Sequence, residues 1–257
     1  MPSSYYDSEA GRYDASRGGP ARADAAAAAI LELLPASAWT VLDVAGGTGI
    51  VGERLGRRVI AVDRSFGMAS VAAGRLPGRV VLGDAAGLPF ADGSMDAVTM
   101  IWLMHLLPDA VGAIGEVARV LRPGGSFVLT VNKADAHYMT DDDIGTVLGP
   151  AWRAANPAPV DGRSSVTELA AERGLILAGE TTFVGVGQGR SPAHWANYVR
   201  DPVSGWPDRC DVTELCAQLG ALPDQDRPRE DPVYHLVSFT GTISLPSGMS
   251  DTGISLK

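Results

Sequence analysis

Short apolar runs alternate with helix-favouring stretches over the first half of the chain. The runs predict five strands, at residues 39–45, 59–62, 79–82, 95–102 and 126–131. The stretches before and between them predict helices at residues 21–34, 50–57, 68–76 and 110–121. Strand–helix alternation at this spacing implies crossover connections, so we expect a parallel sheet covered by helices on both faces.

The regular alternation of predicted strands and helices ends after Lys133. Residues 134–163 are acidic and contain several prolines, which is typical of an insertion. Further on, the pattern predicts helices at residues 165–173, 191–200 and 212–219, and strands at residues 175–186 and 234–243. The expected fold class is therefore α/β, a Rossmann-like, seven-stranded, mostly parallel sheet with helical and loop insertions that form a lid.

This pattern divides the chain into four parts. They are an N-terminal arm (1–20), a ligand-binding core (21–132), a part with the remaining strands (133–243) and a flexible tail (244–257). The lid insertions fall within the third part, at about residues 134–163 and 188–231. Ligands of such sheets bind beyond the carboxyl ends of the strands. Residues that directly follow a strand are therefore the first candidates for function.

Composition narrows the classes of partner. The net charge of -9 and the pI of about 4.9 disfavour nucleic acid, because binding to its phosphates needs clustered Lys and Arg. Cys210 and Cys216, the only cysteines, lack the spacing of a zinc site or a disulfide framework. The first twenty residues lack an apolar signal core, and the Ala-rich stretch 24–34 is too short to span a bilayer. We expect a cytoplasmic protein without a membrane or nucleic-acid partner.

The first strand ends in a glycine turn that fits G-x-G-x-x-G, from Gly47 to Gly52. Such a turn lets a ligand approach bare backbone, with the amides of a following helix facing the ligand. Asp63 ends the second strand, near the spacing at which an acid receives ribose hydroxyls. Taken singly, each feature also has an explanation without a ligand: a tight turn accounts for the glycines, and a surface acid accounts for Asp63. Together they favour a nucleoside ligand.

Two more acids favour a ligand other than a dinucleotide. Asp84 ends the third strand, where its carboxylate can accept from an adenine amino group while the next amide donates to the ring. Asp43 lies inside the first strand, and a buried carboxylate is costly unless it is paired. A ligand ammonium would offset that cost, whereas a pyrophosphate would be repelled.

Taken together, these motifs resemble class I S-adenosylmethionine-dependent methyltransferases of the UbiE-like, or type 11, small-molecule group. The matching segments are residues 13–17, 41–49, 61–63, 83–85, 90–96, 105–109 and 116–125. The resemblance is close over about residues 5–132 and extends to the rest of the chain only in layout. It implies S-adenosylmethionine as cofactor and no metal.

The resemblance also assigns cofactor contacts. The expected set is Tyr13, Arg17, Asp43, Ala45, Gly46, Gly47, Gly49, Asp63, Arg64, Met68, Asp84, Ala85 and Trp102. The turn from Ala45 to Gly49 would pass under the methionine part, although glycine is commoner than alanine at its first position. Asp63 would hold both ribose hydroxyls, with Arg64 beside the adenine.

The remaining expected contacts surround the adenine and the sulfonium. Asp84 and the amide of Ala85 would read the adenine, and Met68 would line its slot or belong to the core. Trp102 would lie near the sulfonium. Tyr13 and Arg17 would close the N-terminal arm over the cofactor, with Arg17 near its carboxylate, unless the arm is simply solvated.

His105, which follows the fourth strand, is the catalytic candidate. Its imidazole can accept a proton from an attacking hydroxyl, but it can equally be a structural residue. Methyl transfer needs mainly in-line positioning, so the reaction does not by itself require a base. His137 and His194 are weaker candidates, located in the lid. The acids 141–143 predict a solvated face or a helix cap rather than a metal site.

The sequence thus predicts an enzyme that moves the methyl group of S-adenosylmethionine to a small organic acceptor. The acceptor would be a secondary metabolite methylated on oxygen or nitrogen, and the enzyme a monomer or homodimer. A non-methylating cyclase or a binding protein that retains the cofactor is the alternative. A nicotinamide-dependent reductase is a third, disfavoured by the lack of a recognisable Tyr-x-x-x-Lys set.

Overall fold

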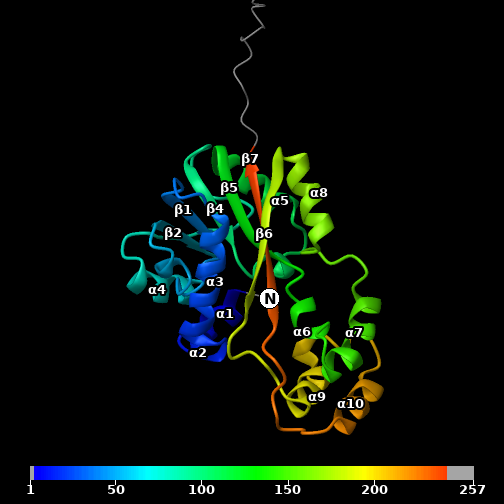
Figure 1. Cartoon of the computed structure of the whole chain (residues 1–257). Helices are drawn as coiled ribbons and strands as arrows, with labels where there is room; N and C mark the ends of the chain where they lie inside the picture. Colours follow the sequence, from blue (N-terminus) through cyan, green and yellow to red (C-terminus); the bar gives the residue numbers. More distant parts are fainter. Residues whose placement is uncertain (1–2, 242–257) are drawn as a thin grey trace, which may run out of the picture.

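A seven-stranded sheet forms the centre of the molecule (Figure 1). The computed structural model describes residues 3–241. Its strands are β1 (Thr40–Val44), β2 (Arg58–Asp63), β3 (Val80–Leu82), β4 (Met95–Met100), β5 (Leu121–Val131), β6 (Leu175–Val184) and β7 (Val233–Gly241). Their order is β3-β2-β1-β4-β5-β7-β6, and only β7 runs antiparallel to its neighbours. The predicted fold class is confirmed.

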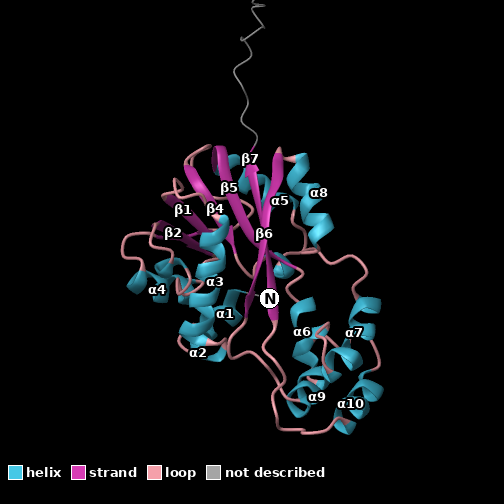
Figure 2. Cartoon of the chain, in the orientation of Figure 1, coloured by secondary structure: helices cyan, strands magenta, loops and turns pink. Residues whose placement is uncertain are grey.

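Helices cover the sheet and extend beyond one of its ends. They are α1 (Ser3–Glu9), α2 (Tyr13–Ser16), α3 (Gly19–Leu33), α4 (Phe66–Arg75), α5 (Val111–Val120), α6 (Asp135–Tyr138), α7 (Asp143–Ala155), α8 (Arg163–Glu172), α9 (Pro192–Arg200) and α10 (Val212–Ala221). Short 3-10 helices are η1 (Gly52–Arg54), η2 (Met104–Leu106) and η3 (Pro202–Ser204). Figure 2 separates these helices from the magenta sheet.

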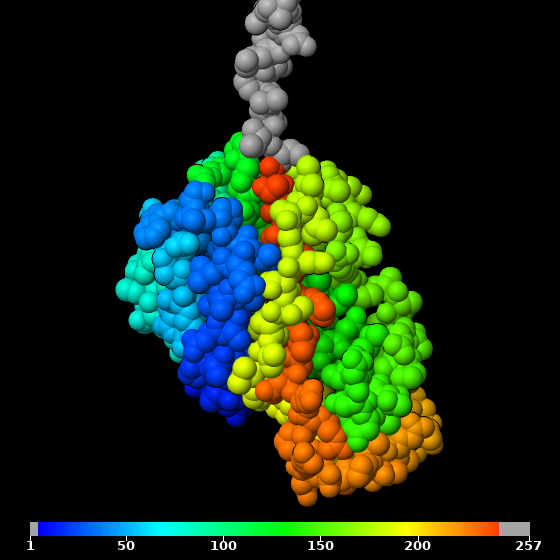
Figure 3. Space-filling view, in the orientation of Figure 1, coloured from blue at the N-terminus to red at the C-terminus, as the bar shows by residue number. Residues whose placement is uncertain are grey.

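Two hydrophobic layers hold the sheet between helices. Alternating strand residues such as Leu42 and Val98 pack with α5 and α8 on one face. Their neighbours, such as Val41 and Ala97, pack with the alanines of α3 on the other face. This division follows from the two-residue period of a strand, which sends successive side chains to opposite faces. Figure 3 shows α3 in blue beside β6 in yellow.

The predicted helix over residues 50–57 is wrong. The chain makes turns after Gly49 and then only η1, before β2 begins. Gly49 and Gly56 both have left-handed backbones, with φ of 74° and 59°, so a right-handed helix cannot run through either. The glycine turn is therefore not followed by an α-helix, and its ligand site has no helix N-terminus behind it.

Other predicted elements differ mainly at their ends. Helix 21–34 begins two residues earlier, at Gly19, and strand 95–102 ends at Met100. Residues 122–125 lie within β5, where the register with β4 shifts. The predicted tail, 244–257, lies outside the described residues.

The lid helices α6, α7, α9 and α10 form a separate group below the sheet in Figure 1. Their contacts are aromatic: Tyr138 of α6 packs against Trp152 of α7 and Trp195 of α9, with ring centroids 4.6 and 5.4 Å apart. Trp206, which is fully buried, packs against the same tyrosine. These rings give the lid a hydrophobic core of its own, separate from the two layers of the sheet.

Candidate active site

The glycine turn after β1 has an unusual backbone. Ala45, Gly47 and Gly49 have φ of 56°, 57° and 74°. A Cβ on Gly46 would lie 2.9 Å from the Asp43 carboxylate, and one on Gly47 would meet nothing within 4 Å. The backbone at Gly47 therefore faces open space, as a turn that receives a ligand requires. Ala45 adopts a left-handed backbone that glycine would reach at lower cost.

Asp43 lies beneath this turn. Its side chain is 4% exposed, and its Oδ1 accepts a 2.8 Å hydrogen bond from Thr99 Oγ1. Burial, only partly offset by that bond, raises the pKa of Asp43 to about 6, and the nearby Asp63 carboxylate adds to the rise. Because the carboxylate is covered by the turn, it supports the turn rather than presenting an open surface to a ligand ammonium.

Asp63, at the end of β2, joins two loops. Its Oδ2 accepts from the Gly47 amide at 2.9 Å and its Oδ1 from the Ser65 amide at 2.8 Å. Burial raises the pKa of Asp63, while these amides and the nearby Arg64 guanidinium lower it. The carboxylate is half-buried, and each oxygen retains a lone pair. The predicted ribose-binding acid thus lies directly against the glycine turn.

The residues predicted to contact adenine follow β3 and begin α4. Asp84 is exposed, and its Oδ1 accepts a hydrogen bond from the Ala86 amide at 2.9 Å. The amide of Ala85 does not take part in this hydrogen bond. Met68 is 2% exposed and belongs to the inner side of α4. Its amide donates to Ser65 Oγ, which caps the helix.

The N-terminal arm is anchored on the glycine turn and on α4. Asp14 of α2 accepts from Thr48 Oγ1 at 2.6 Å and pairs with Arg75 at 2.7 Å. Arg75 also donates to the Thr48 carbonyl at 2.8 Å. Asp7 of α1 accepts from Ser65 Oγ and the Gly67 amide, at 2.6 and 2.9 Å. The sequence did not indicate these anchors, because Asp7 and Asp14 look like ordinary surface acids until the folded arm brings them to their partners.

These anchors bring Tyr13 and Arg17 to the carboxyl edge of the sheet. The Arg17 guanidinium lies 5.7 Å from the Tyr13 ring centroid. Its buried Nε has no hydrogen-bond partner among the described residues. Arg17 also lowers the pKa of His105, which shows that the arm faces the end of β4.

Trp102 and His105 follow β4. Trp102 has a left-handed backbone, with φ of 58°, and its ring packs against Tyr234 and Phe183. Burial, with Lys133 and Arg17 nearby, lowers the pKa of His105 to about 3. The imidazole is therefore neutral at physiological pH but weakly basic. Its Nδ1 and the Trp102 Nε1 are buried, and neither has a partner among residues 3–241.

The residues present fit S-adenosylmethionine. An open turn, a half-buried acid and an exposed acid follow β1, β2 and β3 in the order that methionine, ribose and adenine require. The buried nitrogens without a partner on Arg17, Trp102 and His105 belong to the N-terminal arm and to the residues after β4. Bound ligand groups would satisfy such buried donors, which are costly when left alone.

The lid histidines and acids have structural partners. His137 Nε2 lies 2.9 Å from the Tyr234 hydroxyl, and burial lowers the pKa of His137 well below its usual value. Asp142 caps α7 by accepting from the Gly145 amide at 2.9 Å, as predicted for a helix cap. No group of metal-binding side chains occurs in the described part of the chain, and none of its helices is long and apolar enough to cross a membrane.

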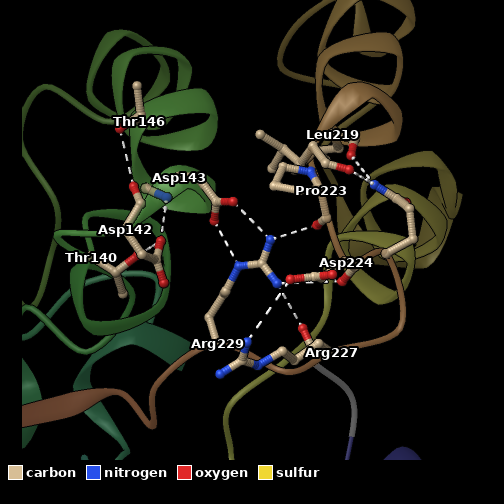
Figure 4. A network of polar contacts seen from close by, with 12 residues as sticks. Thr140, Asp142, Asp143, Thr146, Leu219, Pro223, Asp224, Arg227 and Arg229 are labelled. Atoms are coloured by element: carbon tan, nitrogen blue, oxygen red, sulfur yellow. Dashed lines mark hydrogen bonds and ion pairs between the residues drawn. The ribbon is translucent and has the colours of Figure 1, made fainter.

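A polar network joins α7 to the segment after α10 (Figure 4). The Arg229 guanidinium donates to both carboxylate oxygens of Asp143, at 2.8 and 2.7 Å, and to the Pro223 carbonyl at 2.9 Å. A cavity of about 830 Å³ lies here, and its lining includes Asp141, Asp143 and Asp224 together with Arg227 and Arg229. It contains none of the predicted cofactor-binding residues, so we assign it no part in the site.

Comparisons with known proteins agree with this geometry. Residues 42–129 match the family model of a methyltransferase domain. The chain is 42% identical over 121 residues to an uncharacterized methyltransferase of Mycobacterium tuberculosis, covering 46% of this chain and 49% of the relative. It is 30% identical over 184 residues to a demethylmenaquinone methyltransferase of Renibacterium salmoninarum, covering 70% and 65%. The chain thus spans about half to two thirds of the length of these curated relatives.

A solved structure from Bacillus halodurans, assigned to the methyltransferases, superposes with a TM-score of 0.57 at 20% identity, covering 84% of this chain and 98% of the other. At that identity the likeness concerns the fold. Sequence and fold agree: residues 42–129 match the methyltransferase-domain family, and the chain has the Rossmann-like fold of a solved methyltransferase structure.

Proposed function

We propose that this chain transfers the methyl group of S-adenosylmethionine to a small organic acceptor, on oxygen or nitrogen. The observation that carries the proposal is the contact between Asp63 and the glycine turn, with Gly47 N 2.9 Å from Asp63 Oδ2. It brings the predicted sites for methionine and ribose together at one edge of the sheet. The bound cofactor supplies an activated methyl group.

Residues of the chain hold the cofactor from three sides. Asp63 accepts from the ribose hydroxyls with its free lone pairs, and its raised pKa reflects a carboxylate that gains from such donors. Asp84 and the Ala85 amide, at the end of β3, bind the adenine. Arg17, brought in by the anchored arm, binds the cofactor's carboxylate through the guanidinium that lacks an ion pair within residues 3–241.

The acceptor binds between the ends of β4 and β5 and the lid. Trp102 and His105 delimit this space on the β4 side. Positioning alone aligns the nucleophile with the methyl group and the sulfur, because a sulfonium is already a good leaving group. His105 remains a candidate proton acceptor, but a pKa of about 3 makes it a weak one before the acceptor binds.

Calorimetry of S-adenosylhomocysteine binding tests the cofactor site. Asp63→Ala removes the carboxylate that the proposal places on the ribose, so we expect affinity to fall at least a hundredfold, comparable to the loss of two charge-assisted hydrogen bonds of about 1.5 kcal/mol each. Asp208→Ala, an exposed acid in the lid, is the matched control and should bind like the wild type. Near-wild-type affinity of Asp63→Ala would contradict the proposal.

A second readout separates transfer from binding alone. If S-adenosylhomocysteine forms in step with a methylated product, the chain is a methyltransferase. If the cofactor binds and is never consumed, the chain is a non-methylating cyclase or a binding protein instead.

A further inference from the structure

Three cations converge where the acceptor is proposed to bind. Arg17 comes from the arm, Arg22 from α3 and Lys133 from the loop after β5; we call them the inner cations. Arg22 is 6% exposed, and its Cζ lies 4.0 Å from the Trp102 ring centroid. Trp102 itself follows β4, so Arg22 lies beside the proposed methyl-transfer position.

β4 and β5 are parallel neighbours, so Lys133, which follows β5, lies at the same sheet edge as Trp102 and the Arg22 guanidinium over its ring. Burial, together with Arg17 and Arg22, lowers the pKa of Lys133 to about 8, and Asp161 opposes this only in part. Lys133 and Arg17 likewise lower the pKa of His105. Like charges held together out of bulk water are destabilising unless an anion joins them.

The nearby carboxylates are engaged elsewhere. Asp14 pairs with Arg75 and accepts from Thr48. Asp161, 3% exposed, accepts from the backbone amide of Lys133 at 2.8 Å. Among residues 3–241 none of the inner cations takes part in an ion pair. The positive charge at this edge is therefore not balanced by the protein.

Unsatisfied donors point to the same place. The described residues contain six buried side-chain nitrogens without a partner. Four of them belong to the inner cations or to the residues that follow β4: Arg17 Nε, Arg22 Nε, Trp102 Nε1 and His105 Nδ1. The nitrogens of Arg17, Arg22 and Trp102 can only donate, and a ligand with acceptor oxygens would satisfy them. His105 Nδ1 donates or accepts, depending on the tautomer of the ring.

We propose that the acceptor is an organic acid whose carboxylate binds between Arg22 and Lys133, beside Trp102. The inference rests on the proposed function, which gives Arg17 to the cofactor's own carboxylate and leaves the other two cations for the acceptor. S-Adenosylmethionine carries more positive than negative charge, so its binding increases the need for an anion here. The planar fork of Arg22 and the flexible ammonium of Lys133 suit a carboxylate approached from two sides.

Calorimetry on the full chain with saturating S-adenosylhomocysteine tests this inference with matched pairs of probes. The pairs are benzoate with benzamide and 3-phenylpropionate with 3-phenylpropanamide, which are alike in shape and differ in charge. We expect at least one acid to bind tenfold or more tightly than its amide. Equal binding within both pairs, or no binding of either acid, would overturn the inference.

Variants locate the anion. Lys133→Met and Arg22→Met should each weaken acid binding at least tenfold and leave amide binding unchanged, whereas Lys133→Arg should retain the preference for acids. Arg22 is buried, so its replacement can disturb folding. Lys133 is half-buried, and Lys133→Met therefore serves as the variant that keeps the fold. Arg58→Met, on an exposed side chain of β2, is the control.

The two proposals fail differently. If the wild type does not bind S-adenosylhomocysteine, the proposed function fails. If it binds the cofactor product normally and Lys133→Met leaves acid binding unchanged, only the assignment of the acceptor fails.

Discussion

Left-handed backbones at non-glycine residues mark the functional edge. Of the four that occur within residues 3–241, three follow central strands: Ala45 after β1, Trp102 after β4 and Asn132 after β5. Such conformations cost about 1–2 kcal/mol each and persist only where the surrounding structure enforces them. Each turns the chain sharply at the strand end, which places the next side chains over the edge where the ligand is expected.

Asp43 makes a pH-dependent contribution to stability. Its pKa in the folded state, about 6, lies above the value of 3.8 for an unperturbed Asp. The folded state is therefore favoured below the lower value, and this advantage is lost as pH rises through about 6. Asp43→Asn removes the effect and keeps an acceptor for Thr99, so the wild type should lose about 2 kcal/mol relative to the variant between pH 4 and 7.

Urea unfolding of both proteins across this range measures that difference. Parallel stability curves for wild type and Asp43→Asn would show that Asp43 titrates normally. Asp92→Asn, at an exposed acid, should run parallel to the wild type and serves as the control.

His105 should stay neutral throughout the physiological range. Burial and two nearby cations lower its pKa to about 3, so its ring gains a proton only in strong acid. Nitrogen NMR of imidazole-labelled protein should show no His105 titration between pH 5 and 8. A midpoint near 6.5 would mean that the ring is solvated and far from Lys133 and Arg17.

At the scale of elements, the sequence predicted where the strands end, but it did not predict how the N-terminal arm is anchored. Apolar runs and the residues after them predicted the edge at which Asp63, Asp84 and His105 lie. The helix at 50–57 failed because its glycines serve the turn and not a helix. Neither Arg22 nor the anchors of the arm carried a local signal, since their contacts join segments that are far apart in the sequence.

Gly67 tests how the arm is held. A Cβ at this position would lie 2.8 Å from the Asp7 backbone, so Gly67→Ala must push α1 away from α4. We expect faster proteolysis of the arm near Gly11 and at least a tenfold loss of affinity for S-adenosylhomocysteine. Gly74→Ala, in the same helix, meets nothing within 4 Å and should be neutral or stabilising by up to about 1 kcal/mol.

Protection of the arm in Gly67→Ala equal to that in Gly74→Ala would contradict the docked position of α1. Unchanged cofactor affinity with a released arm would show that Arg17 is not needed for the cofactor's carboxylate.

At the scale of the molecule, the sheet and the lid have separate cores. The alternation of strands and helices predicted the sheet, because each element buries one face against its neighbours. The lid could be predicted only as an insertion. Its four aromatic side chains, Tyr138, Trp152, Trp195 and Trp206, are scattered over some seventy residues and meet only in the folded chain. The proposed acceptor side of the site, which we assign in part to this lid, is for that reason the least predictable part.

The central claim is that the chain transfers a methyl group between the carboxyl edge of the sheet and the lid. The most direct measurement incubates the full chain with S-adenosylmethionine labelled with ¹³C in its methyl group and a mixture of small organic acids, phenols and amines. We predict that S-adenosylhomocysteine and a ¹³C-methylated product appear in equal amounts, and that Asp63→Ala forms neither. Cofactor that binds to the wild type and stays unconsumed with every acid, phenol and amine supplied would contradict the account.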